Sequence, residues 1–412
     1  MSQGFKYERL FASSAPPANL ARAFAPRVRY DFAVAYPDPD SLPLEGLWQA
    51  AREALRREGR DLALYPQSRG NLALRELIAD KLARDRGMKV STEEITLANG
   101  SMQAITLLFE VFLEPGDIVL TERFFYLGTL RALRRFKADI IGIPTDEDGM
   151  LMDELEKALK RLASEGKRPK FIYTIPAYQN PDGSVLSLER RKRMLELSRE
   201  HGIPVIEDDC YVDLRYEGEM PPAMHSMDAD GRVMYLSSFS KIVAPGVRLG
   251  WVVAPEEVTG RILAIKLDGG PNEFASLVVR DYLRKEMYPH IAEINGIQRV
   301  KRDAMLSALG ENFPLTCRWS KPKGGLYIWL ELPLGADTVK LQEAALKEGV
   351  GYISGVTFSP ADEGKNFLRL CFGYNTPEEI REGVKILARV AQREGMLDPK
   401  HKGGDLVDGG EC

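Results

Sequence analysis

The sequence predicts an α/β protein with a mostly parallel central sheet and a smaller α+β region near its C-terminal end. Short apolar segments alternate with amphipathic helical segments along most of the chain. Buried parallel strands appear in a sequence as such continuous apolar runs. The chain has 412 residues, which is long enough for a large core and for more than one domain.

The predicted elements begin with two helices, at 44–58 and 71–86. Strand-like segments then alternate with helices up to residue 255. The strands are EITLA (94–98), DIVLTE (117–122), ADIIGIP (138–144), PKFIYTIP (169–176), IPVIEDD (203–209), VMYLSS (233–238) and VRLGWVVAP (247–255), and the helices are 101–113, 126–136, 153–164 and 187–201. A helical region follows at 256–312, and we expect it to be interrupted at residues 269–271 and 288–290, where prolines lie.

The C-terminal part predicts a small α+β domain. Its strands are expected at 324–333, 350–354 and 366–373, and its helices at 338–348 and 377–394. We therefore divide the chain into four parts. They are an N-terminal arm (1–43), a large domain (44–290), a small domain (291–396) that part of the arm joins, and a tail (397–412) whose composition is typical of disorder.

The composition argues against several classes of function. The chain is 44% hydrophobic and 28% charged, with a formal net charge of -4, which is typical of a soluble protein that does not bind nucleic acid. Its four cysteines and four histidines are scattered, so we expect a reducing cytoplasm and no metal site. No apolar run reaches the roughly 18 residues that indicate a membrane span, and the N-terminus lacks the apolar core of a signal peptide.

The candidate chemical groups follow the predicted strands, because ligands of open α/β sheets bind beyond the carboxyl ends of strands. Gly100-Ser101 opens a helix and is either a phosphate cradle or a plain helix cap. Asn180 lies in a turn-rich loop and is either a turn residue or a donor to a ligand. Residues 207–209 are three acids at one strand end, which is costly unless they meet cations, a metal ion or a protonated ring nitrogen.

Lys241 follows the segment SSFS at the end of another predicted strand. A lone lysine is usually a solvated surface group, but the residues around this one are apolar or small. Partial burial would lower the pKa of the amine and make it a nucleophile able to form a Schiff base. Arg248, seven residues later, could pair with a phosphate.

Together and in this order, these residues resemble the fold type I pyridoxal-phosphate enzymes, the aspartate-aminotransferase superfamily. The resemblance rests on the block SFSK…PGxRxGW (238–251), with support from IPAYQNPDG (175–183) and EDDCY (207–211). It is closest to the branch that holds aminoadipate and kynurenine aminotransferases and the effector domains of MocR-type regulators. It covers residues 30–395 or so, and it implies the PLP-transferase fold type I.

The resemblance implies a role for each residue of the cofactor site. Lys241 would hold pyridoxal 5′-phosphate (PLP) as a Schiff base and move the proton between the substrate Cα and the cofactor. Asp208 would face the pyridine nitrogen, and Tyr211 with Asn180 would hydrogen-bond the 3′-oxygen. The remaining cofactor contacts would come from Gly100, Ser101, Met102, Ser238, Ser240 and Arg248 at the phosphate, and from Tyr126 stacked on the ring.

The resemblance also implies a substrate site and a dimer. Arg369, in NFLRLCFG, would bind the α-carboxylate of the substrate together with Asn180. Tyr65, in LYPQSRG, would reach the phosphate of the neighbouring subunit, so that a homodimer is needed for function.

Three departures from the family pattern fall on the substrate side. Val34-Ala35 stand where the family has Gly-Gly, and Tyr36 after them is expected to enter the pocket. Met102 replaces a glutamine. Phe124-Phe125 precede Tyr126 where a proline is usual, which suggests an altered pocket mouth. On the arm, Arg22 and Arg27 are either solvated or reach an acidic substrate side chain.

The leading hypothesis is a PLP-dependent aminotransferase that interconverts an L-amino acid and a 2-oxo acid. The alternative is a non-transaminating enzyme of the same fold, such as a lyase, cyclase, γ-replacement or annulating enzyme of specialised metabolism. A PLP-binding regulator is the third hypothesis. It is disfavoured because MocR regulators carry a DNA-binding domain ahead of this one, where this chain has only about 40 residues.

Overall fold

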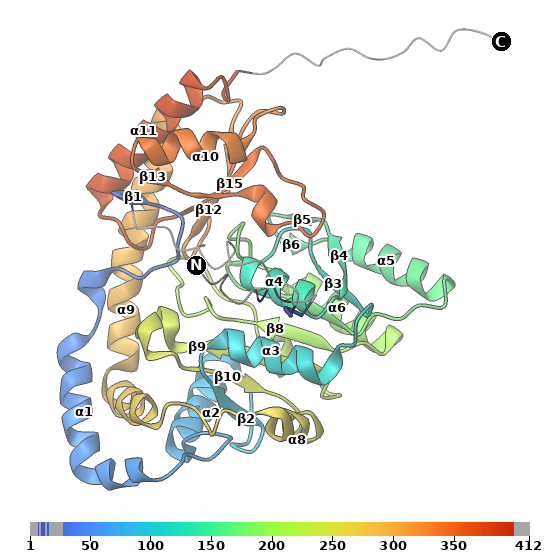
Figure 1. Ribbon diagram of the computed structural model, residues 1–412, viewed down its shortest axis with the longest axis vertical. Coiled ribbons are helices and arrows are strands. Elements are labelled where there is room, and N and C mark those ends of the chain that lie inside the picture. The colour runs from blue at the N-terminus through green and yellow to red at the C-terminus, as the bar shows by residue number, and fades with distance from the viewer. Residues whose placement is uncertain (1–6, 8–9, 13–14, 16–27, 399–412) are drawn as a thin grey trace, which may run out of the picture.

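The computed structural model of the chain describes residues 7, 10–12, 15 and 28–398. Arg22, Arg27 and the tail from residue 399 lie outside the described residues. Figure 1 shows a larger lower part built around a sheet and a smaller upper part. The long helix α9 (Glu273–Asn312) runs along one side of both.

A seven-stranded sheet forms the centre of the larger part, in the order β2-β10-β9-β8-β7-β3-β4. Strand β10 is antiparallel to both of its neighbours, and the other neighbouring strands are parallel. The strands are β2 (Ile95–Ala98), β3 (Ile118–Glu122), β4 (Asp139–Ile143), β7 (Phe171–Thr174), β8 (Val205–Asp208), β9 (Val233–Ser238) and β10 (Gly250–Val253). The predicted α/β fold with a mostly parallel sheet is confirmed.

Helices cover both faces of this sheet. Successive side chains of a strand point to opposite faces, and in β3 Val119 and Leu120 belong to two different apolar cores. The first core includes residues of α3 (Ser101–Phe112) and α4 (Leu127–Arg135), and the other includes residues of α5 (Met152–Ser164) and α6 (Leu188–His201). Strands β2, β7, β8, β9 and β10 are buried along their whole length, which explains their continuous apolar runs, whereas the edge strand β4 is only partly buried.

The other helices of this part are α1 (Leu44–Glu58), α2 (Leu72–Arg86), the short α7 (Met224–Met227) and α8 (Glu256–Ile265). The predicted interruption at 269–271 is present, since α8 and α9 are separate helices. The predicted interruption at 288–290 is wrong, because α9 continues through Pro289. A proline inside a helix removes one hydrogen bond. Here α9 packs along α1, α2 and α11, and this tertiary packing outweighs the local cost.

The smaller part contains a four-stranded antiparallel sheet in the order β11-β12-β15-β14. Its elements are β11 (Arg318–Trp319), β12 (Tyr327–Glu331), α10 (Thr338–Lys347), β14 (Ile353–Ser354), β15 (Phe367–Cys371) and α11 (Pro377–Arg393). Strand β1 (Tyr30–Asp31) pairs with β13 (Val350–Gly351), so the chain enters the fold beside its C-terminal part. The domain boundary placed between residues 290 and 291 falls within α9 and stays a prediction.

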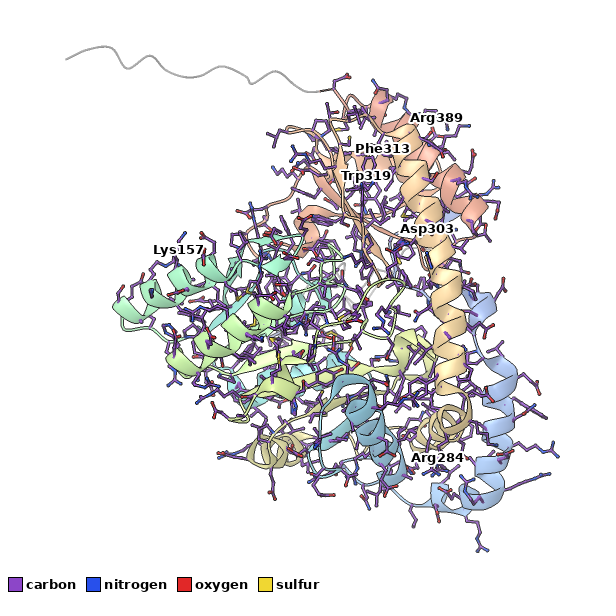
Figure 2. The ribbon with its side chains drawn as sticks, turned by 180° about the vertical axis from the view of Figure 1, so that it is seen from behind. Lys157, Arg284, Asp303, Phe313, Trp319 and Arg389 are labelled. Carbon is purple, nitrogen blue, oxygen red and sulfur yellow. The ribbon has the colours of Figure 1, made fainter. Side chains whose placement is uncertain are left out.

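Short elements complete the described chain. They are the hairpin strands β5 (Thr145–Asp146) and β6 (Gly149–Met150), and the 3-10 turns η2 (Pro39–Ser41), η3 (Gly59–Ala63), η4 (Phe239–Lys241), η5 (Pro245–Val247) and η6 (Gly355–Phe358). Charged side chains such as Lys157 on α5 and Arg389 on α11 project from the outer faces of their helices (Figure 2). No helix in the described ranges is long and apolar enough to cross a membrane.

Candidate active site

The candidate residues gather at one edge of the large sheet. Strands β7, β8 and β9 are parallel, so their carboxyl ends meet there. Asp208 is the last residue of β8, and Lys241 ends the turn η4 that follows β9 directly. Between them lies a cavity of about 150 Å³, lined by Ser101, Met102, Tyr126, Ile175, Asp208, Cys210, Tyr211, Ser238, Ser240, Lys241, Pro245 and Arg248. Most of the predicted cofactor residues thus come together, and their individual roles stay predictions.

Three acids lie at the end of β8 and just beyond it, and for two of them neighbouring cations account for the burial of the carboxylate. Glu207 lies 3.4 Å from the guanidinium of Arg191 and accepts hydrogen bonds from two backbone N–H groups, those of residues 224 and 225. Asp209 lies 3.0 Å from the guanidinium of Arg86. Both acids are fully buried, so these cations offset the desolvation of their charges. Only Asp208 is left without a cation.

Asp208 has one satisfied and one unsatisfied oxygen. The hydroxyl of Tyr173 donates to Oδ2 at 2.6 Å, while Oδ1 is buried and has no hydrogen-bond partner among the described residues. Burial raises the pKa of this carboxyl to about 6. The oxygens of Asp209 also lack hydrogen bonds but lie against Arg86, whereas Oδ1 of Asp208 has no cation beside it. A cationic N–H donor would satisfy Oδ1 and restore the charged form. A protonated ring nitrogen has this chemistry.

Lys241 is a partly buried amine on the opposite side of the cavity. Its Nζ donates a hydrogen bond to the carbonyl oxygen of Ala35 at 3.0 Å. Burial lowers the pKa of this amine, and the nearby Arg369 and Arg248 act in the same direction. A lowered pKa increases the share of neutral amine, which is the nucleophilic form.

The other end of the cavity suits an anion. Helix α3 begins there, and the first N–H groups of a helix have no acceptor within it. The guanidinium of Arg248 lies over this helix start and donates to the carbonyl oxygens of Pro245 (3.2 Å) and Asn99 (3.1 Å). Gly100 has a φ of +82°, and a Cβ at this position would collide with that guanidinium. Because Gly100 has no side chain, the guanidinium of Arg248, the N-terminus of α3 and the hydroxyl of Ser101 can all face the same end of the cavity.

A buried polar cluster extends from the cavity toward the small sheet. Arg369, on β15, donates from Nη1 to Oδ1 of Asn180 at 2.8 Å and from Nη2 to the carbonyl oxygen of Ala33. The amide nitrogen of Asn180 lies 3.5 Å from the hydroxyl of Tyr211. The Nε of Arg369 is buried and has no hydrogen-bond partner in the described part of the chain. This guanidinium can therefore still donate to a carboxylate.

Other predicted residues lie away from the cavity. The ring of Tyr36 packs edge-on against Tyr374 and does not line the cavity, so its contact with substrate stays a prediction. Tyr65 is 94% exposed and does not reach the cavity of its own chain. Phe125 is fully buried, and Phe124 packs against an aromatic cluster of the small sheet. Neither phenylalanine lines the cavity, so the altered pocket mouth stays a prediction.

Three residues of the site were missed by the sequence analysis. Tyr173 donates to Asp208, Cys210 lines the cavity, and the hydroxyl of Tyr327 lies 2.7 Å from that of Tyr211. Cys210 could have been found, because it stands between two predicted site residues. The two tyrosines could not, because each occurs in an apolar strand where an aromatic residue is expected in the core.

This fold and this arrangement of lysine, aspartate and arginine define a class of amino-acid enzymes, and comparisons with known proteins identify the family. A family model described as "Aminotransferase class I and II" matches residues 33–387. The chain therefore belongs to the class I and II aminotransferases. It interconverts an amino acid and a 2-oxo acid, and the predicted family and activity are confirmed.

Individual relatives agree with this assignment. The aromatic-amino-acid aminotransferase 1 of Thermococcus litoralis is 37% identical over 361 residues, which is 87% of each chain. A multiple substrate aminotransferase from Thermococcus profundus superimposes with a TM-score of 0.90 at 34% identity, over 95% of this chain and 99% of the other. The α-aminoadipate aminotransferase of Thermus thermophilus, solved with N-(5′-phosphopyridoxyl)-L-leucine, gives 0.88 at 31% identity, over 94% and 99%.

Proposed function

We propose that this aminotransferase works with pyridoxal 5′-phosphate bound between Asp208 and Arg248, and that its functional form is a cytoplasmic homodimer. The observation that carries the proposal is the unsatisfied, buried Oδ1 of Asp208 opposite the amine of Lys241. When bound, PLP supplies an aldehyde that takes up the amino group and a ring that withdraws electrons from the substrate Cα.

The two ends of the cavity hold the two ends of the cofactor. Oδ1 of Asp208 accepts the N–H of the pyridine ring and keeps the proton at that nitrogen. The start of α3, the hydroxyls of Ser101, Ser238 and Ser240, and the guanidinium of Arg248 bind the phosphate. Tyr126, which lines the same cavity, stacks on the ring and orients it. Tyr211 and Asn180 bind the oxygen on the ring.

Lys241 is the proton-carrying group. With PLP bound, its Nζ would be the amine that holds the cofactor at its aldehyde end, and the same nitrogen would move the proton at the substrate Cα. Both tasks need the neutral amine, which the lowered pKa of Lys241 provides. The hydrogen bond of Nζ goes to a backbone carbonyl oxygen rather than to a carboxylate. The amine can therefore leave this contact without breaking an ion pair.

Arg369 binds the α-carboxylate of the amino acid. Its contact with Asn180 fixes the plane of the guanidinium, and the unpartnered Nε supplies a further donor. Two parallel N–H donors match the two oxygens of a carboxylate. The substrate is therefore oriented with its Cα toward Lys241. Tyr36, close to the same arm segment, is proposed to contact the remainder of the substrate.

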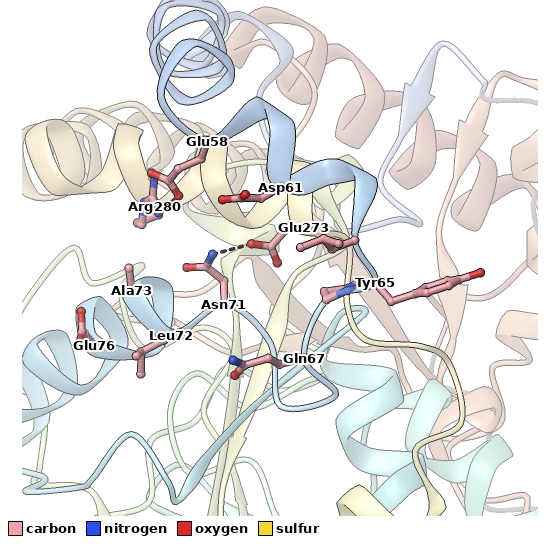
Figure 3. A pocket seen from close by; sticks show the side chains of 12 residues that line it. Glu58, Asp61, Tyr65, Gln67, Asn71, Leu72, Ala73, Glu76, Glu273 and Arg280 are labelled. Atoms are coloured by element: carbon pink, nitrogen blue, oxygen red, sulfur yellow. Dashed lines mark hydrogen bonds and ion pairs between the residues drawn. The ribbon is translucent and has the colours of Figure 1, made fainter.

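The dimer is supported by an exposed apolar surface around Tyr65. Figure 3 shows a hollow beside α1, η3 and α2 with the Tyr65 side chain extending away from it. Apolar side chains exposed on these and adjoining elements are Trp48, Leu62, Leu64, Leu72, Leu267 and Phe274. Of these, Leu64 and Leu72 line the hollow together with Tyr65, and exposed apolar side chains that adjoin one another are typical of protein interfaces. A second copy of the chain would cover them and receive Tyr65 at its phosphate site.

The proposal is tested by trapping the cofactor on the protein. Purified enzyme is reduced with borohydride, digested and mapped by mass spectrometry. We expect the mass of a reduced phosphopyridoxyl group on the peptide that contains Lys241. A protein that carries no such group after incubation with PLP, or that carries it on another lysine, would contradict the proposed cofactor site.

A further inference from the structure

We propose that Tyr327 is a positioning residue for the reaction, because its hydroxyl fixes the direction in which the Tyr211 hydroxyl donates. This inference rests on the proposed function, since the acceptor of the Tyr211 hydroxyl is the ring oxygen of the cofactor. The residue acts from the small sheet on a group of the large domain, and it contacts no reacting atom itself.

The position of Tyr327 is well defined. It is the first residue of β12 and is 1% exposed. Its hydroxyl lies 2.7 Å from that of Tyr211 and 3.3 Å from the amide nitrogen of Asn180. Its ring meets the ring of Tyr211 edge-on at 5.4 Å. On its other side, the guanidinium of Arg369 lies 4.3 Å from the ring centre, a cation–π contact that holds the ring in place.

The direction of the hydrogen bonds follows from the donors available. Oδ1 of Asn180 accepts from Arg369, so the amide nitrogen of Asn180 faces both phenols and donates to them. Each phenol has a single proton. Within the described residues, the only acceptor near the Tyr327 hydroxyl is the oxygen of Tyr211. Either hydroxyl could donate to the other when the cavity is empty. Once a ligand oxygen in the cavity accepts the Tyr211 proton, a buried Tyr327 proton without an acceptor would be costly, so Tyr327 then donates to Tyr211.

This direction leaves the proton of Tyr211 free. If Tyr211 donated to Tyr327, it would have no proton for a ligand. With Tyr327 as the donor, Tyr211 points its own proton at the cavity that it lines. A hydroxyl that accepts one hydrogen bond is also polarised and becomes a stronger donor in a buried site.

The charged and titratable groups around Tyr327 do not compete for its proton. Those that face it are Arg369, Cys371, Tyr211 and Tyr126, and no carboxylate is among them. A stronger donor at the ring oxygen stabilises the negative charge on that oxygen. In the proposed holoenzyme, the nitrogen of Lys241 would share a proton with this oxygen. A more stable negative charge on the oxygen lowers the pKa of that nitrogen.

The test is a pH titration of the visible absorption of the holoenzyme, for the wild type and Tyr327→Phe. The variant removes one oxygen and keeps the ring that packs on Arg369. We expect its titration midpoint to rise by about half a unit to one unit, the size expected from one neutral hydrogen bond. Tyr352→Phe is the matched control. It removes a buried hydroxyl of the small domain that donates to Thr338, and its midpoint should equal that of the wild type.

Two further variants keep the test decisive. Tyr327 replaced by 3-fluorotyrosine keeps the hydroxyl and the fold but makes a stronger donor, and we expect its midpoint to fall. In a Tyr211→Phe background, Tyr327→Phe should cause no further shift, because the two hydroxyls act in series. An unchanged midpoint in the Tyr327 variants, spectra that do not titrate between about pH 5 and pH 10, or an equal shift in the Tyr211→Phe background would overturn the inference. A wild type without a visible band would instead overturn the proposed cofactor.

Discussion

The amine of Lys241 and the carbonyl oxygen of Ala35 are joined by a hydrogen bond of 3.0 Å, although 206 positions separate them in the sequence. The guanidinium of Arg369 donates in the same way to the carbonyl oxygen of Ala33. The segment 33–35 thus contacts both basic groups of the substrate site through neutral backbone oxygens. Neither contact places a carboxylate beside these groups, so Arg369 remains available to an anionic ligand and nothing there holds the proton on the Lys241 amine.

Asp208→Asn tests the charge of the acid that is proposed to face the pyridine ring, and the free energy of unfolding is the measured quantity. The pKa of Asp208 in the folded protein without cofactor is raised to about 6, from an ordinary value of 3.8. Its favourable contribution is fully present below the unfolded value and is lost as pH rises through the folded one. The cofactor-free variant does not lose this stability, because the asparagine side chain does not ionise. We expect its stability relative to the wild type to increase by roughly 2 kcal/mol between pH 4 and pH 7.

Thermal melts of both cofactor-free proteins at several pH values measure this difference. With PLP bound the order should reverse, because the wild-type carboxylate then has a cationic partner. A stability difference that does not vary with pH would show that Asp208 is ionised throughout and has another partner.

Arg369→Lys tests the recognition of the α-carboxylate. Lysine keeps the charge but loses the two parallel donors, so we expect the KM for the amino acid to rise about 10- to 100-fold. The variant should still bind the cofactor and show a visible band, although the band's pH midpoint can shift because Arg369 also contacts Asn180 and Tyr327. Arg389→Lys on the outer face of α11 is the matched control, with no expected change. An unaltered KM in the Arg369 variant would place the carboxylate elsewhere.

Gly100→Ala tests the phosphate end of the cavity. The substitution introduces a Cβ at a φ of +82° that collides with the guanidinium of Arg248. Gly166→Ala is a close control, because Gly166 has a φ of +69° and its Cβ would meet nothing within 4 Å. Gly166→Ala should lose about 1 kcal/mol of stability from the strained backbone alone, and Gly100→Ala should lose at least as much because its Cβ also displaces Arg248.

Only Gly100→Ala should also bind PLP more weakly, by about tenfold or more, because a displaced Arg248 loses its phosphate contact. Equilibrium dialysis against PLP measures this affinity. Equal affinities in the two variants would contradict a phosphate site at the start of α3.

Hybrid dimers test the sharing of active sites between subunits. Lys241→Ala inactivates the site of its own chain, and Tyr65→Ala is expected to weaken the site of the partner. A hybrid of the two variants keeps one intact site, with the native Lys241 of one chain and the native Tyr65 of the other. Random reassociation of equal amounts should therefore restore about a quarter of the wild-type activity. No gain over the separate variants would show that Tyr65 does not act across an interface.

Much of the fold could be predicted because local and tertiary preferences agree. Most strands of the large sheet are buried on both faces, so each of these is a short apolar run. The caps Asn71 and Ser187, which accept hydrogen bonds from the first turns of α2 and α6, mark the starts of these helices. The predicted helix interruption at Pro289 was wrong, because packing along the length of α9 outweighs the local preference of proline against a helix.

The site was predictable where its residues lie in one local segment at a strand end. Asp208, Tyr211, Lys241 and Arg248 are of this kind. Tyr327 was not predictable, because its hydroxyl meets Tyr211 only after two segments 116 positions apart have folded together. The contact between the rings of Tyr36 and Tyr374 was not predictable for a similar reason, since no sequence pattern indicates it, and the contact of Tyr36 with substrate stays a prediction.

The most direct measurement of the central claim is the absorption spectrum of the purified enzyme during its two half-reactions, with Lys241→Ala alongside. The wild type should show a visible band that an L-amino acid shifts to the near ultraviolet and that a 2-oxo acid restores. The lysine variant should lack this band in its resting state. A wild type that stays colourless after incubation with PLP would contradict the account. So would a visible band that no L-amino acid shifts and no 2-oxo acid restores.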